Sequence, residues 1–89
     1  MNDKIVKALC NPVRLKIIQC LSESDKTVTQ LIGNCSLSQS AVSQHLMKLK
    51  SAGLVKNKPE GREIIYSLSN KNLSKISTLI LNLSKEKNI

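Results

Sequence analysis

The sequence has few aromatic residues and few metal-binding side chains, and each shortage argues against a class of function. Tyr66 is the only aromatic residue among 89. Proteins that bind RNA or single-stranded DNA stack bases on several exposed aromatic rings, so that mode of binding is disfavoured. The metal-binding types are limited to one histidine, His45, and to three cysteines at positions 10, 20 and 35 without a CxxC pair. Because a zinc site usually needs four closely spaced ligands, we predict neither a metal nor a cofactor.

Long apolar runs are also missing. No run exceeds three residues, as in Leu79-Ile80-Leu81, which is far too short to span a bilayer, and the first residues lack the apolar core of a signal peptide. Reduced cysteines fit a cytosolic protein, so we expect a cytoplasmic location and no membrane partner. No nucleophile–base pair, glycine-rich phosphate loop or carboxylate pair is apparent, so we do not expect an enzyme.

Acidic residues are scarce relative to basic ones. Fourteen Lys and Arg face six Asp and Glu, which gives a net charge of +8. A small basic chain favours a polyanionic partner, most often nucleic acid, over the alternative of a merely soluble basic protein. Because duplex DNA is recognised through polar groups in its grooves, the lack of aromatic residues leaves double-stranded DNA as the expected partner.

The length fits one domain, 1–89, and the apolar spacing predicts five helices and one hairpin. Asn11-Pro12 separates the first two helices, Ser38 is a suitable N-cap, and Gly53 is a suitable residue after a helix end. The predicted helices are 3–10, 12–22, 27–34, 39–52 and 70–86, and the predicted hairpin has arms 54–58 and 62–68 with a turn at 59–61.

This order predicts a mainly α (α+β) fold of the winged helix-turn-helix type, with four helices, a β-hairpin and a final helix. Two helices joined by a turn of about four residues and followed by a basic hairpin define that arrangement. The helix over 39–52 would then be the one that enters the major groove, and the hairpin would be the wing.

The helical wheel of the predicted fourth helix separates its residues into two sides. Val42, Leu46 and Leu49 lie within about 60° of one another and should face the core. Apart from Met47, the opposite side is polar, and no Asp or Glu occurs from Ser36 to Pro59. An ordinary solvated helix usually mixes Glu with Lys, whereas Ser, Gln and Lys can bind base edges and phosphates.

The predicted DNA contacts come from this helix and from the hairpin. His45 lies at the edge of the apolar stripe, where contact with a neighbouring element or a phosphate is favoured over a metal role. The wing lysines and arginine would bind phosphate or the minor groove, with simple solubility as the alternative. The predicted contacts are Ser38, Gln39, Ser40, Ser43, Gln44, His45, Lys48, Lys56, Lys58 and Arg62.

Four segments in this order resemble the ArsR/SmtB family of winged helix-turn-helix repressors. The resemblance covers about residues 5–70, in order and nearly without gaps, and its four segments are the opening motif, the recognition helix, the segment after it and the wing strand. They are 8–18 (ALCNPVRLKII), 37–46 (LSQSAVSQHL), 49–55 (LKSAGLV) and 61–68 (GREIIYSL).

The resemblance implies a homodimer joined through its first and last helices, which represses by occupying an operator until an inducer binds. The last helix independently carries more Leu and Ile than one face needs, which supports a dimer. Two reading helices about one DNA turn apart, roughly 34 Å, would match an inverted repeat. The predicted interface residues are Ile5, Val6, Leu9, Leu73, Ile76, Leu79, Ile80 and Leu83.

Two metal sites of the family are absent here. Thr27-Val28-Thr29 stands where metal-sensing relatives carry Cys-Val-Cys, and the last helix has no His or Asp. Cys10 and Cys20 leave a thiol or arsenite sensor open, against the alternative of buried apolar cysteines. A winged-helix module that binds protein and a nonspecific DNA binder are further alternatives. The polar side of the fourth helix disfavours both, because it is neither acidic nor apolar and carries few Lys and Arg.

Overall fold

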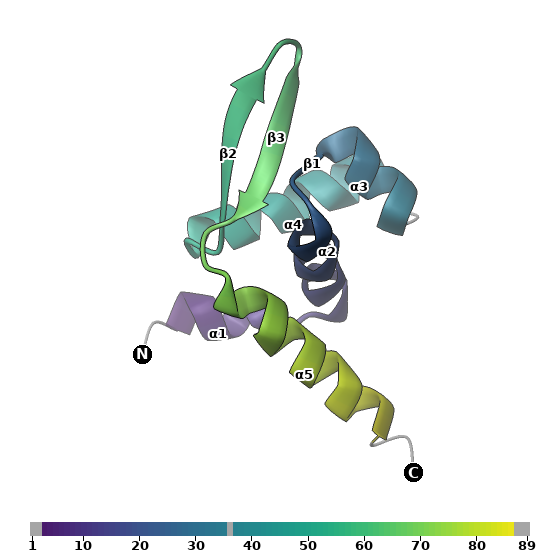
Figure 1. Cartoon of the computed structure of the whole chain (residues 1–89), viewed down its shortest axis with the longest axis vertical. Coiled ribbons are helices and arrows are strands. Elements are labelled where there is room, and N and C mark those ends of the chain that lie inside the picture. The colour runs from purple at the N-terminus through teal and green to yellow at the C-terminus, as the bar shows by residue number, and fades with distance from the viewer. Residues whose placement is uncertain (1–2, 36, 87–89) are drawn as a thin grey trace.

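The computed structural model describes residues 3–35 and 37–86, and it has the predicted element order with one additional strand (Figure 1). The helical body carries a β-hairpin that projects away from it, and the last helix extends in another direction. The elements are α1 (Asp3–Leu9), α2 (Pro12–Glu23), β1 (Lys26–Thr27), α3 (Val28–Cys35), α4 (Gln39–Ser51), β2 (Val55–Glu60), β3 (Glu63–Leu68) and α5 (Asn72–Glu86).

Local signals set the ends of α2 and α4 as predicted. Asn11 caps α2, because its Oδ1 accepts hydrogen bonds from two backbone N–H groups of the first turn, and Pro12 occupies the first helical position. Ser38 caps α4 by accepting from the backbone N–H of Ala41 at 3.1 Å. Gly53 follows α4 with φ +78°, a conformation that glycine adopts without strain.

The short strand β1 was not expected. Residues 23–26 lie between the predicted helices 12–22 and 27–34, but Lys26 and Thr27 pair with Tyr66 and Ile65 of β3. The sheet is antiparallel with the order β1-β3-β2. Two residues are too few to show a strand pattern, so the pairing depends on β3 lying beside them.

The hairpin turn is displaced from the predicted 59–61. Pro59 and Glu60 belong to β2, and Glu60 pairs with Glu63, which leaves Gly61 and Arg62 as a two-residue turn. Proline is compatible with β2 because this strand lies at the edge of the sheet. Gly61 has φ +65°, which a two-residue hairpin turn requires at its start.

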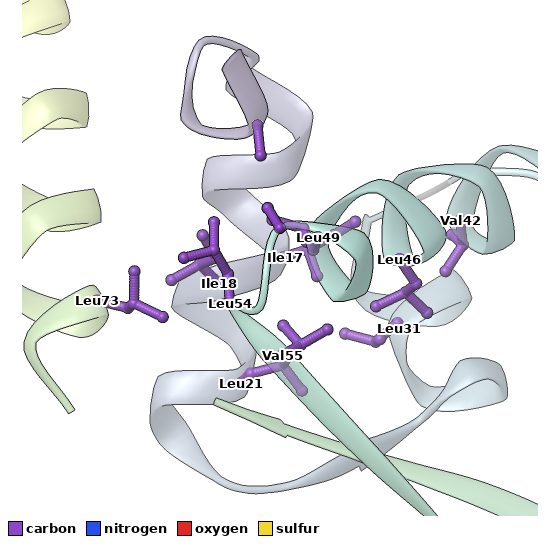
Figure 2. Close-up of a cluster of buried hydrophobic side chains, with 12 residues drawn as sticks. Ile17, Ile18, Leu21, Leu31, Val42, Leu46, Leu49, Leu54, Val55 and Leu73 are labelled. Carbon is purple, nitrogen blue, oxygen red and sulfur yellow. The ribbon is translucent and has the colours of Figure 1, made fainter. Parts of the chain in front are cut away.

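The core lies where α2, α3, α4 and the base of the hairpin meet (Figure 2). Ile17 and Ile18 of α2 and Leu31 of α3 are completely buried, and Leu54 and Val55 continue this cluster into β2. Tyr66 and Leu68 pack against it from β3, whereas Ile64, on the same face by alternation, is exposed near the hairpin tip.

Helix α5 packs on α2 with only part of its apolar surface. Leu73 joins the core from α5, and Gln19 Nε2 donates to Thr78 Oγ1 at 3.0 Å. Leu79 and Leu83 on the same helix are largely exposed. Within residues 3–35 and 37–86, no helix has both the length and the apolarity needed to cross a membrane.

Leu46 and Met47 give a matched test of this packing. Leu46 is 1% exposed and Met47 is 70% exposed on the same turn of α4. We expect Leu46→Ala to lower the free energy of unfolding by about 2–5 kcal/mol, because it leaves a cavity, and Met47→Ala to change it by less than about 0.5 kcal/mol. Urea denaturation measures both, and equal losses would contradict the placement of α4.

Candidate nucleic-acid interface

Helix α4 is held in one rotational orientation by its buried stripe. Val42, Leu46 and Leu49 are at most 1% exposed and pack in the core, as predicted. Because residues on a helix advance by about 100°, this contact turns the opposite side of α4 to solvent.

The solvent side of α4 is polar and carries no carboxylate. Ser40, Gln44, Lys48 and Ser51 are exposed along it, and Met47 is the apolar exception. Ser38, Gln39 and Ser43 are also exposed, although the Ser38 hydroxyl already accepts the capping hydrogen bond. This surface offers amide, hydroxyl and ammonium groups, which match base edges and phosphates.

His45 has a more constrained position than the other predicted contacts. It is half-buried, and its Nδ1 lies 3.3 Å from a terminal nitrogen of Arg14 on α2. Burial lowers the pKa of His45 below its usual 6.5, and the positive charges of Arg14 and Lys48 lower it further. The lowered pKa therefore favours the neutral form of the ring at pH 7.

The hairpin places basic side chains beyond the C-terminal end of α4. Lys56 and Lys58 are exposed and alternate along β2, so they lie on the same face about 7 Å apart along the strand. Arg62 is in the turn. Glu60 and Glu63 pair beside this turn, so the tip carries charges of both signs. The positive part of the wing is therefore its middle.

A second basic surface lies between α1 and α4. An open cavity of about 410 Å³ is lined by Lys4, Lys7 and Arg14 on one side and by Met47 and Lys48 among others on the α4 side. These α1 and α2 residues were not among the predicted contacts. The spacing of Lys4 and Lys7, three apart and therefore on one side of a helix, was the available signal.

The predicted dimer residues form an apolar face with one exception. A groove of about 620 Å³ between α1 and α5 is lined mainly by apolar side chains, including Ile5, Val6, Leu9, Ile76 and Ile80. Leu79 and Leu83 are exposed farther along α5.

Leu73, by contrast, is 4% exposed and belongs to the core of its own chain. Its position near the start of α5, where the helix packs on α2, leaves it almost no surface for a partner.

The two cysteines of interest are separated by a large part of α2. Cys10 is exposed and lines the apolar groove, whereas Cys20 is half-buried against the core. Pro12 and Cys20 are about 12 Å apart along the helix axis, so Cys10, just before Pro12, and Cys20 lie toward opposite ends of α2. The side chain of Cys35 lies outside the described part of the chain. Among the described residues, no three His, Cys, Asp or Glu side chains are grouped as metal ligands.

A family model and individual relatives both match this chain to one family of regulators. Residues 11–57 match the family described as bacterial regulatory protein, arsR family. The HTH-type transcriptional repressor SmtB of Mycobacterium tuberculosis is 40% identical over 73 residues, which are 82% of this chain and 54% of SmtB. The chain thus spans about half the length of SmtB.

The transcriptional activator HlyU of Vibrio cholerae is 40% identical over 65 residues, 73% of this chain and 60% of HlyU. The HlyU structure superposes with a TM-score of 0.79 at 35% identity, covering 90% of this chain and 87% of that one. The homodimeric winged helix-turn-helix domain Mb0332 of Mycobacterium bovis gives a TM-score of 0.81 at 26% identity, covering 96% and 79%. The winged-helix fold is therefore confirmed.

The lowered pKa of His45 predicts a pH dependence of stability. Its pKa is about 6.5 in the unfolded chain and lower in the fold, so below 6.5 the unfolded state binds more protons. The neutral His45 ring therefore contributes to the free energy of unfolding. This contribution is fully present above pH 6.5 and is lost as the pH falls through the lowered pKa of His45. Urea denaturation across this range should show a steeper acid loss for the wild type than for His45→Gln, and parallel losses would contradict it.

Proposed function

The chain belongs to the arsR family of bacterial regulatory proteins, and on that premise we propose that it is a homodimeric repressor that binds an inverted-repeat operator in duplex DNA. The observation that carries the proposal is the exposed, polar and carboxylate-free side of α4, opposite its buried stripe. The place of action would be the cytoplasm, where the DNA of a bacterium lies.

The proposed contacts divide into base-reading and phosphate-binding groups. Gln39 and Gln44 can each pair with both hydrogen-bonding positions of adenine, and Ser40 and Ser43 can bind bases or phosphates. Lys48 would bind guanine or phosphate. Ser38, His45, Lys56, Lys58 and Arg62 would contact the DNA backbone or, from the wing, the minor groove.

The proposed dimer covers the apolar face of α1 and α5 with a second copy of the chain. Val6, Ile76, Leu79, Ile80 and Leu83 each expose between 38% and 65% of their surface, which is unusual for large apolar residues that lie on one face. The homodimeric state of Mb0332, which shares the fold, supports the same partner here. Two-fold symmetry would then place two α4 helices on one side of the DNA.

Repression, as opposed to activation, is supported by the similarity to SmtB, although HlyU is named an activator. In vitro transcription from a promoter that contains the operator separates the two, because a repressor lowers the yield of transcript and an activator raises it. A thiol sensor based on Cys10 and Cys20 is less favoured, since one chain keeps these residues apart. A protein-binding module is less favoured because the exposed side of α4 is neither acidic nor apolar.

Gln44→Ala tests base reading. Selection of bound duplexes from a random pool first supplies the operator, and fluorescence anisotropy then measures binding. We expect the variant to weaken operator binding by about 1–3 kcal/mol and to relax base preference, because a bidentate contact to a base edge is lost. Equal losses on operator and random DNA would rule out this role.

Lys58→Ala is the matched comparison for a phosphate contact. It should weaken binding to operator and random DNA alike and lower the slope of log affinity against log salt by about one, because one fewer counterion is released.

Ile80→Lys tests the dimer. Ile80 lines the groove but is not part of the core, so the fold should survive while a charge enters the apolar interface. We expect analytical ultracentrifugation to show a dimer for the wild type and a monomer for the variant, with operator affinity reduced at least tenfold. Asn82→Lys, an exposed change on the same helix, is the control. A wild-type monomer at micromolar concentration would contradict the proposal.

A further inference from the structure

Arg14 lies in the first turn of α2, whose start is set by Asn11 and Pro12. It is the third residue of α2, after the capping residue Asn11 and Pro12, and its own backbone N–H donates to Asn11 Oδ1 at 3.1 Å. Helical side chains lean toward the N-terminus of their helix. The Arg14 side chain is thereby directed back to the end of α1.

The guanidinium of Arg14 joins three helices. Its Nε donates to the carbonyl oxygen of Ala8 at 2.7 Å, and Nη2 donates to that of Lys7 at 3.2 Å. These carbonyls lie in the last turn of α1, where a helix has acceptors left over from its own backbone pattern, and that of Lys7 also accepts from the backbone N–H of Cys10 at 3.3 Å. The third nitrogen, Nη1, lies 3.3 Å from Nδ1 of His45 on α4.

The third contact determines where the proton of His45 resides. A guanidinium has five N–H donors and no acceptor, so a hydrogen bond between these two groups requires His45 Nδ1 to accept. The neutral ring then carries its proton on Nε2. The lowered pKa of His45 is consistent with this, since protonation would place an N–H on Nδ1 against Arg14.

We propose that Arg14 is a positioning residue of the DNA interface, which holds His45 as the Nε2–H tautomer so that this N–H is donated to a DNA phosphate. This inference rests on the proposed function of DNA binding. Because α1 also carries Ile5, Val6 and Leu9 of the apolar groove, the same guanidinium connects the proposed dimer helix to the reading helix.

The tautomer can be measured without DNA. His45 is the only histidine, so ¹⁵N-labelled protein gives one pair of ring nitrogen signals. Above pH 7 we expect Nδ1 to show the shift of an unprotonated nitrogen and Nε2 that of a protonated one. Arg14→Lys keeps the charge but loses the fork geometry, and should shift the ring toward a mixture of both tautomers. A mixture or an Nδ1–H form in the wild type would overturn the inference.

Two variants of His45 test the phosphate contact. His45→Gln places an amide N–H near the position of Nε2, whereas His45→Asn keeps an acceptor near Nδ1 and removes the distal donor. We expect Gln to retain affinity within about threefold and Asn to lose about 5- to 20-fold on operator and random DNA. The salt slope should not change, because the neutral ring displaces no counterion. Equal affinity of Asn and wild type would overturn the DNA role.

The possible failures are distinguishable. A locked tautomer in a wild-type protein that binds no duplex DNA refutes the proposed function together with the DNA role of His45. Specific DNA binding by a protein whose His45 ring mixes both tautomers refutes the role of Arg14 and leaves the proposed function in place. If Arg14→Lys does not fold, the wild-type tautomer and the two His45 variants still decide the inference.

Discussion

The contact of one narrow stripe of α4 with the core determines what the rest of that helix presents to solvent. Val42, Leu46 and Leu49 are buried in the core formed with α2, α3 and β2. The apolar surface that they bury together stabilises the fold by several kcal/mol. A rotation of α4 by even a quarter turn would expose part of this stripe and bury Gln44 or Lys48 without partners. The polar side of α4 faces solvent because exposing the apolar side would lose the burial of Val42, Leu46 and Leu49.

The same packing also sets the position of the hairpin and of the proposed dimer face. Gly53 ends α4 through its positive φ, and Leu54 and Val55 return the chain to the core, so the hairpin begins next to the end of α4. Helix α5 is held on α2 by Leu73 and by the Gln19–Thr78 hydrogen bond. The remaining apolar residues of α5, such as Leu79 and Leu83, stay exposed. One small core therefore supports two surfaces: a polar and basic one on α4 and the hairpin, and an apolar one on α5.

Most of this architecture follows from patterns that act over a few residues. The spacing of apolar residues, the caps at Asn11 and Ser38 and the glycine at position 53 predict α2 and α4 because each is a local effect. The errors come from pairing across the chain. Strand β1 exists because β3 lies beside it, and Pro59 remains in a strand because that strand is at an edge.

The candidate site was predictable to a similar extent. The polar side of α4 follows from helical periodicity alone, which is why its residues could be named from sequence. The contacts of the Arg14 guanidinium with α1 and with His45 could not be predicted from sequence, since they depend on how three helices meet. Leu73 was assigned to the dimer face for a related reason: periodicity identifies an apolar residue but not which of two apolar surfaces will cover it.

The most direct test of base reading by α4 is the effect of 7-deazaadenine, which lacks only the major-groove acceptor N7, at each adenine of the operator. If Gln44 or Gln39 pairs with adenine, one or more positions in each half-site should weaken wild-type binding by about tenfold, and at the position read by Gln44 the Gln44→Ala variant should lose nothing further. Full wild-type affinity at every adenine would contradict the claim that α4 reads the operator in this way, and losses by Gln44→Ala equal to those of the wild type at every adenine would exclude Gln44 as a reader.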